Sequence, residues 1–240
     1  VARGLRPCLN GKNEVSILVL KNMINKVGTV EEALAHIHSG NRVMVGGFGL
    51  VGVPTSMMKA IAESDLEDLT IISNDGGRPN TIKNELMCSG KVKKLIATYV
   101  GANPAVGKLI GEGKLDAEMV PQGTFAERVR CGGYGLGGVL TPTAVGTTLA
   151  KGKQVITVDG KDYLLELPLR ADVAIVRAHR ADPFGNLSYR YVGKNYNPYM
   201  AMAADFVIAE VDELVEEGTF SDSEIETPGI VVDMIIMRED

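Results

Sequence analysis

Short apolar runs alternate with helix-like segments from residue 28 to residue 130, and glycine or polar turns separate the two. Strands are predicted at residues 42–46, 69–73, 94–100 and 117–120, where brief aliphatic runs end in turn residues. Helices are predicted from the capping box at Thr29 to about residue 39, from Pro54, over 81–89, around 106–110 and over 123–130. This repetition of strand, loop and helix indicates an α/β fold with an open, mostly parallel sheet and helices on both faces.

The second half of the chain has a different pattern, which predicts β-hairpins. Residues 132–138 contain too much glycine for the interior of a helix or strand. The runs 155–158 and 163–167 flank Asp159-Gly160, a strong hairpin signal. A second turn at 182–186 separates runs 173–178 and 187–191, and a helix at 197–204 and strands at 206–211 and 230–237 follow. We therefore expect a β-hairpin-rich second half within one domain over residues 23–240.

The first 22 residues show little periodicity, and an orderly pattern begins only near Gly28. The apolar run Val15–Leu20 is too short for a signal-peptide core or a membrane span. We expect Met23 to be the natural start and residues 1–22 to be a non-native or disordered extension.

Composition and charge narrow the function classes. Apolar residues make up 45% of the chain and charged residues 23%, as in globular proteins. A net charge of −5 and the absence of Trp argue against a nucleic-acid partner. Three scattered cysteines and three histidines form no disulfide framework or metal motif. We therefore expect a cytoplasmic protein with no metal ion and no membrane partner.

The stretch GGFGLVGVP, Gly46–Pro54, follows the apolar run at residues 42–45 and contains a G-x-G-x-x-G pattern from Gly47. That spacing occurs in dinucleotide-binding folds, where the helix begins inside the motif and an acidic residue follows by about 20 positions. Here Pro54 predicts a helix that begins after the motif, and Asp75 lies 28 residues after Gly47. The glycines are also explained by a tight turn alone, or by a turn whose backbone approaches an anion or an acyl group.

A second motif, Val120–Thr124, places Gln122 at the carboxyl end of a predicted strand and at the start of a helix. Ligands of open α/β sheets bind at that edge, so the Gln122 amide is predicted to point into a ligand crevice. The alternative is a solvated glutamine in the first turn of a helix. Glu127, Arg128 and Arg130 on that helix are predicted to form a solvated or ion-paired face.

Taken together, these stretches resemble the class I coenzyme A transferases, in particular alpha subunits of the acetate/butyrate–acetoacetate type. The resemblance spans residues 28–237. The matching strings are GGFGLVGVP, SNDGG at 73–77, TYVGANP at 98–104, VPQGTFAERVRCGGYGLGGVLTPTAVGT at 120–147, LPLRADVAIVRAH, DPFGNLSY and KNYNPYMAMAAD. Asn186 and Asn197 lie in these strings, but the resemblance assigns them no chemical role.

The resemblance implies a ping-pong transfer of coenzyme A between acyl-CoA and a carboxylic acid, with a glutamate as the nucleophile. It implies that coenzyme A binds at Gly46, Gly47, Phe48, Gly49, Leu50, Val51 and Gly52. Gln122 matches the glutamine whose amide donates to the thioester oxygen as it becomes an oxyanion. The nucleophile of the family lies in a Glu-Asn-Gly sequence of the beta half, and this chain contains no Glu-Asn-Gly.

We therefore expect a beta-subunit partner, in a heterotetramer of two alpha and two beta chains, and no metal or nicotinamide cofactor. The run Asn74–Pro79 departs from a common Asn-Asn-Ala-Gly form, which bears on the choice of substrate. Two alternatives remain at this point: a non-catalytic acyl-CoA-binding module and a nicotinamide-dependent oxidoreductase.

Overall fold

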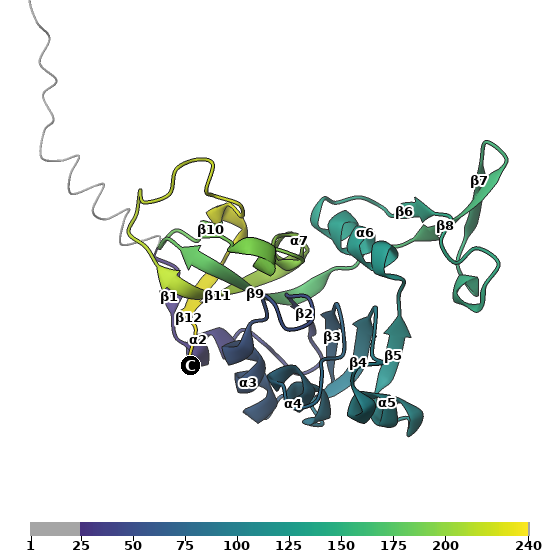
Figure 1. Cartoon of the computed structure of the whole chain (residues 1–240), viewed down its shortest axis with the longest axis horizontal. Coiled ribbons are helices and arrows are strands. Elements are labelled where there is room, and N and C mark those ends of the chain that lie inside the picture. Colours follow the sequence, from purple (N-terminus) through teal and green to yellow (C-terminus); the bar gives the residue numbers. More distant parts are fainter. Residues whose placement is uncertain (1–24, 240) are drawn as a thin grey trace, which may run out of the picture.

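A computed structural model describes residues 25–239. Its main sheet has nine strands in the order β1-β12-β11-β9-β2-β3-β4-β5, with β10 paired to β9, and a three-stranded sheet β6-β8-β7 stands apart at one end (Figure 1). The strands of the main sheet are β1 (Val27–Gly28), β2 (Arg42–Val45), β3 (Leu69–Ser73), β4 (Val92–Ala97), β5 (Asp116–Met119), β9 (Ala171–Ala181), β10 (Leu187–Ser188), β11 (Ala204–Leu214) and β12 (Met234–Met237). The strands of the small sheet are β6 (Val139–Thr141), β7 (Val155–Val158) and β8 (Lys161–Glu166).

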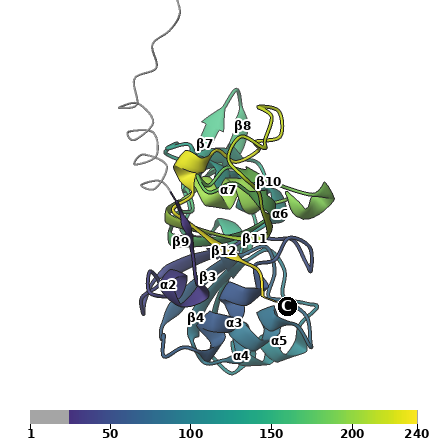
Figure 2. The ribbon, with the colours of Figure 1, turned by 90° about the vertical axis from the view of Figure 1, so that its left-hand side faces the viewer.

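Helices cover both faces of the main sheet (Figure 2). They are α2 (Val30–Leu34), α3 (Thr55–Glu63), α4 (Ile82–Cys88), α5 (Pro104–Gly111), α6 (Gln122–Gly133) and α7 (Asn197–Met202). Side chains alternate along β2 in the manner of a strand with two buried faces. Val43 and Val45 join the apolar cluster that contains residues of α2, α3 and α4, whereas Met44 joins the cluster of α6 and α7. The core thus consists of two layers separated by the sheet.

The fold class predicted from the sequence is confirmed. All the pairings of the main sheet are parallel except that of β10 with β9. The predicted hairpin at Asp159-Gly160 joins β7 to β8, with positive φ angles of 50° and 74° at these two residues. Positive φ at both central residues is the geometry that suits the twist of a two-residue hairpin.

Several element boundaries differ from the expectation. Helix α2 ends at Leu34 rather than near residue 39, because tight turns then bring Ile37 into the core at 2% exposure. Strand β4 ends at Ala97 rather than at residue 100. Residues 229–231 form a short 3-10 turn instead of the start of β12, and the Asn186 side chain accepts a hydrogen bond from Gly229 N at 2.8 Å in that turn.

The expectation that residues 132–138 avoid helix was wrong for Gly132 and Gly133, which lie in the last turn of α6. The reason is close packing: a Cβ atom on Gly132 would lie 1.9 Å from the backbone oxygen of Leu169. The helix therefore approaches the segment between β8 and β9 more closely than any side chain at that position permits. Glycine costs a helix about 1 kcal/mol relative to alanine, and the tertiary contact outweighs this preference.

Gly132→Ala is accordingly expected to lower the free energy of unfolding by about 1–3 kcal/mol, the usual range for an overpacked site. Urea unfolding followed by circular dichroism measures the change. Gly137→Ala is the matched control, because a Cβ atom there meets nothing within 4 Å. Equal unfolding midpoints for the two variants would contradict the packing argument.

No helix among residues 25–239 is long and apolar enough to cross a membrane. The expectation for residues 1–22 concerns a segment outside the described residues.

Candidate functional site

The glycine-rich loop leaves β2 at its carboxyl end and folds back on itself. Phe48 and Val51 exchange two backbone hydrogen bonds, each with an N···O distance of 3.0 Å. The three glycines of the G-x-G-x-x-G pattern all have positive φ, which explains why glycine occupies these positions. Helix α3 begins at Thr55, after the motif, as Pro54 predicted.

Asn197, the first residue of α7, holds the base of this loop and is fully buried. Its Nδ2 donates to Gly52 O at 3.0 Å and to Gly193 O at 2.9 Å, and its Oδ1 accepts from Arg177 N at 2.9 Å. A Cβ atom on Gly46 would lie 1.9 Å from Asn197 Oδ1. The first glycine of the loop thus makes room for the side chain that anchors its end.

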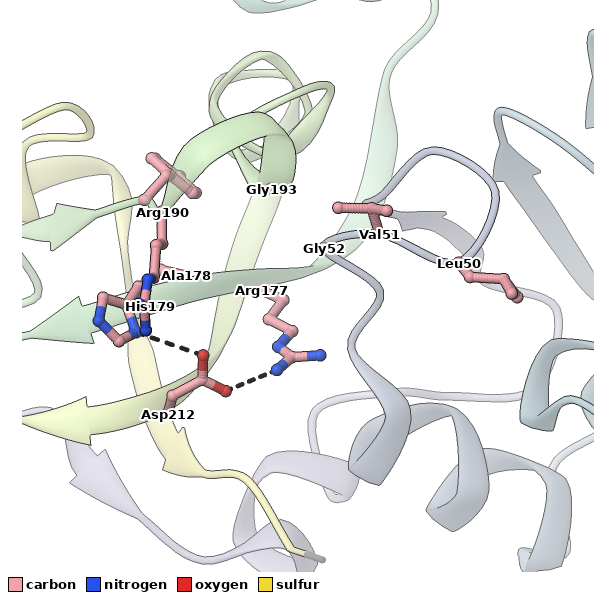
Figure 3. A pocket seen from close by; sticks show the side chains of 10 residues that line it. Leu50, Val51, Gly52, Arg177, Ala178, His179, Arg190, Gly193 and Asp212 are labelled. Atoms are coloured by element: carbon pink, nitrogen blue, oxygen red, sulfur yellow. Dashed lines mark hydrogen bonds and ion pairs between the residues drawn. The ribbon is translucent and has the colours of Figure 1, made fainter.

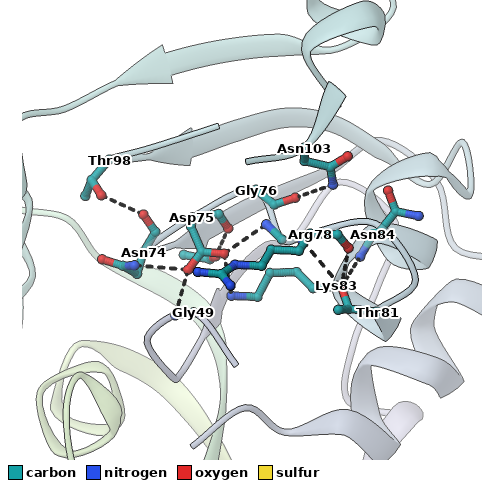
Figure 4. Close-up of polar contacts among 12 residues, drawn as sticks. Gly49, Asn74, Asp75, Gly76, Arg78, Thr81, Lys83, Asn84, Thr98 and Asn103 are labelled. Atoms are coloured by element: carbon teal, nitrogen blue, oxygen red, sulfur yellow. Dashed lines mark hydrogen bonds and ion pairs between the residues drawn. The ribbon is translucent and has the colours of Figure 1, made fainter. Parts of the chain in front are cut away.

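Asp75 ties the loop to the turn after β3 (Figure 4). Its Oδ2 accepts from the backbone N of Gly49 and from Asn74 Nδ2, both at 3.0 Å. Its Oδ1 accepts from Gly77 N at 2.9 Å and lies 3.5 Å from Nζ of Lys83, a lysine on α4. The carboxylate therefore joins β2, β3 and α4 at one point.

The charges of this pair follow from their surroundings. Burial alone would raise the pKa of Asp75, but Lys83 and the hydrogen-bond donors outweigh it and lower that pKa below its ordinary value. Burial lowers the pKa of Lys83, and Asp75 opposes this shift. Because an ionised carboxylate accepts and never donates, Asn74 must turn its NH₂ group towards Asp75.

Gln122 lies at the first position of α6, where its amide orientation follows from that of Asn74. Because Asn74 Nδ2 donates to Asp75, Asn74 Oδ1 faces Gln122 and accepts a hydrogen bond from Gln122 Nε2 at 2.7 Å. Gln122 Nε2 also donates to the Tyr196 hydroxyl at 2.8 Å. The single hydrogen of the Thr98 hydroxyl is shared between Gln122 Oε1 at 2.6 Å and the Asn74 backbone oxygen at 2.7 Å. Three segments distant from Gln122 in the sequence thereby set the direction of its amide.

Gln122 and Phe48 border two adjoining cavities. One, of about 340 Å³, is lined by Phe48, Gly49, Asn74, Asp75, Gly77, Arg78, Thr98, Tyr99, Ala102 and Gln122. The other, of about 330 Å³, is lined by Phe48, Gln122, Ala126, Glu127, Arg130, Asn195, Tyr196 and Tyr199. The structure thus brings Phe48 and Gly49, from the loop, together with Gln122.

The rest of the loop borders a third cavity, of about 260 Å³ (Figure 3). Leu50, Val51 and Gly52 form one side. The opposite side is formed by Arg177, His179, Arg190 and Asp212. The Asp212 carboxylate lies 2.7 Å from a guanidinium nitrogen of Arg177 and 3.4 Å from Nδ1 of His179. Two arginines against one carboxylate leave this cavity with an excess of positive charge. Gly46 and Gly47 line none of the three cavities and form the base of the loop.

Comparisons with known proteins assign the chain to a family. Residues 27–238 match the coenzyme A transferase family model. The chain belongs to the coenzyme A transferase family. It is 47% identical to the acetate CoA-transferase subunit alpha of Escherichia coli K12, over 91% of this chain and 99% of that relative. It is 44% identical to the acetoacetyl-CoA:acetate/butyrate CoA transferase alpha subunit of Clostridium acetobutylicum, over 89% and 98% of the two chains.

Solved structures share the fold at lower identity. An acyl-CoA transferase of Escherichia coli O157:H7, YdiF, superimposes with a TM-score of 0.81 at 22% identity. The match covers 91% of this chain but 48% of YdiF, so the chain spans about half the length of that protein. Glutaconate coenzyme A-transferase from Acidaminococcus fermentans gives a TM-score of 0.78 at 22% identity, over 88% and 75% of the two chains.

Three glutamates bear on the nucleophile that the resemblance implies. Glu112 and Glu217 are each followed directly by glycine, which makes these two sites the most similar to Glu-Asn-Gly in this chain. Both glutamates are exposed at turns. Glu127 borders the cavity of Gln122, but its carboxylate pairs with Arg130 at 2.6 Å, as predicted for an ion-paired face. Among residues 25–239, no cluster of three or more His, Cys, Asp or Glu side chains is suited to a metal ion.

Several residues of the site were missed from the sequence. Thr98, Tyr196 and Asn197 lie in strings that match the family, which was the available signal, but their partners lie in distant elements. Lys83 lies in none of these strings and gave no signal, because its partner Asp75 lies 8 positions away in another element.

Proposed function

We propose that this chain is the alpha subunit of a CoA-transferase. It moves coenzyme A between acetoacetyl-CoA or another short-chain acyl-CoA and an acid such as acetate or butyrate. The reaction is ping-pong, with a glutamate nucleophile on a separate beta subunit and Gln122 as a donor to the oxyanion. The single domain over residues 23–240 works in the cytoplasm, in a heterotetramer of two alpha and two beta chains.

The observation that carries this proposal is the position of Gln122 beside the glycine-rich loop. Its amide lies between two cavities that Phe48 also borders, and its orientation is set by Asn74, Thr98 and Tyr196. A neutral donor held in one direction stabilises charge that develops in a transition state without further reorganisation. The names of the two relatives supply the substrates.

The loop is proposed to bind coenzyme A through Gly46 to Gly52. Phe48, Leu50 and Val51 are 51%, 59% and 44% exposed, an unusual display of apolar side chains for a turn at the carboxyl end of a strand. The cavity of Arg177 and Arg190 lies against this loop and suits the phosphate groups of the cofactor.

The beta subunit is proposed to cover this edge and to bring the missing nucleophile. Beside the exposed loop lie Tyr191 and Val192, which are 83% and 73% exposed, and Asn195 connects the two segments by donating to Val51 O and Val192 O. Contiguous exposed apolar groups of this kind are typical of a protein interface.

Co-expression of this chain with a beta-type chain from the adjacent gene tests the proposal. The purified complex is expected to exchange coenzyme A between acetoacetyl-CoA and acetate, whereas the isolated chain is expected to be inactive. A beta variant without the glutamate of Glu-Asn-Gly is the control, and it should abolish exchange without preventing assembly.

Other outcomes point to the alternatives. Full activity of the isolated chain would refute the need for a beta subunit and would direct attention to Glu127. Tight binding of coenzyme A by the isolated chain, with no stimulation by a beta chain, would favour a non-catalytic binding module. Stabilisation by nicotinamide dinucleotides in a thermal shift assay would favour the oxidoreductase.

A further inference from the structure

The Gln122 amide has no spare hydrogen in this structure. An amide NH₂ group carries two donors. One goes to Asn74 Oδ1 at 2.7 Å and the other to the Tyr196 hydroxyl at 2.8 Å. An incoming oxyanion must therefore displace one of these acceptors before Gln122 can donate to it.

Tyr196 has the opposite property. Its oxygen accepts from Gln122, which leaves its own O–H hydrogen free to donate, and no acceptor for that hydrogen is found within residues 25–239. Burial raises the pKa of Tyr196 and outweighs the hydrogen bond from Gln122, so the hydroxyl remains protonated at neutral pH. A hydroxyl that accepts one hydrogen bond is also polarised towards donating another.

The ring of Tyr196 is held firmly. It lies edge-on to Phe125, with 5.5 Å between ring centroids, and stacks on Phe48 of the loop at 6.4 Å. The residue is 8% exposed and borders the same 330 Å³ cavity as Gln122. The hydroxyl is thus a fixed donor beside the proposed oxyanion donor, on the wall of a cavity.

We propose that Tyr196 is a second oxyanion donor, which acts together with Gln122 on the same substrate oxygen. When the carboxylate nucleophile attacks the thioester carbonyl, the oxygen that gains negative charge accepts from the Tyr196 hydroxyl and from Gln122 Nε2. Gln122 exchanges its bond to the tyrosine oxygen for a bond to the substrate, and the Tyr196 proton stays on the tyrosine. This role rests on the proposed function, because it needs an acyl group at Gln122.

Tyr196→Phe tests the role with little disturbance, because the substitution keeps both aromatic contacts. In the alpha–beta complex, kcat is expected to fall by roughly 10², the lower end for loss of one oxyanion donor. KM for acetoacetyl-CoA and the urea midpoint of unfolding are expected to stay unchanged. Tyr163→Phe, on β8 and outside the three cavities of the site, is the matched control and is expected to retain the wild-type kcat.

The same variant separates a catalytic role from a positioning role. If Tyr196 only held the Gln122 amide, Tyr196→Phe would lower kcat through Gln122 alone and would cause no further fall in a Gln122→Ala complex, whereas a direct donor lowers kcat in both backgrounds. An unchanged kcat in either background therefore overturns the inference while the proposed function stands. A wild-type complex that transfers no coenzyme A fails the proposed function itself.

Discussion

Replacing Gln122 by alanine is expected to lower kcat of the alpha–beta complex by roughly 10²–10³, the measured worth of one oxyanion donor. The side chain donates through Nε2 at the boundary of two cavities, and alanine leaves Asn74 Oδ1 and the Thr98 hydroxyl without this partner. The loss belongs to the transition state, so kcat and kcat/KM are expected to fall together. Initial rates with acetoacetyl-CoA and acetate, each varied at saturation of the other, measure it.

Two further variants define the cause. Gln122→Glu has the same shape but presents a carboxylate to Asn74 Oδ1 and to the oxyanion, so its kcat is expected to be at least as low as that of the alanine variant. Gln154→Ala removes an exposed glutamine that borders a different cavity, and it is expected to keep the wild-type kcat. A Gln122→Ala complex with unchanged kcat would exclude the oxyanion role.

The parallel half of the fold could be predicted because its signals are local. Strands β2, β3 and β4 each contain a short aliphatic run that ends at a turn, and Thr29, Thr81 and Asn103 cap the helices with their own side chains. The errors arose where a distant segment decided the outcome. Glycine occupies position 132 of α6 because Leu169 O leaves no room there for a side chain. Nothing near residue 132 in the sequence indicates that contact.

The candidate site, too, was predictable from the sequence only in part. The strings around the loop and Gln122 pointed to these residues, since both follow a predicted strand at its carboxyl end. The direction of the amide depends on hydrogen bonds that connect Gln122 to Asn74, 48 positions earlier, and to Tyr196, 74 positions later. Such orientation is a property of packed side chains, which periodicity and turn signals do not describe.

Asn197→Ala is expected to lower the free energy of unfolding by about 3 kcal/mol, because each buried partner left unpaired costs about 1–3 kcal/mol. The substitution leaves Gly52 O, Gly193 O and Arg177 N without the bonds they make to this fully buried side chain. For a chain of this length each kcal/mol shifts Tm by roughly 2–4 °C, so Tm is expected to fall by roughly 6–12 °C. Calorimetry and urea unfolding measure the two quantities.

The same variant should also raise KM for acetoacetyl-CoA, because Gly52 O anchors the end of the loop proposed to bind coenzyme A. Asn195→Ala is the matched comparison: its Nδ2 bonds to Val51 O and Val192 O are exposed, water replaces them, and less than about 1 kcal/mol is expected to be lost. Asn197→Asp keeps the acceptor for Arg177 N but sets a carboxylate against two carbonyl oxygens, so its stability should be no better than that of the alanine variant. Since the one side chain serves both the fold and the loop, stability and KM should change together. A normal KM in a destabilised Asn197→Ala complex would show that the loop holds its shape without this anchor.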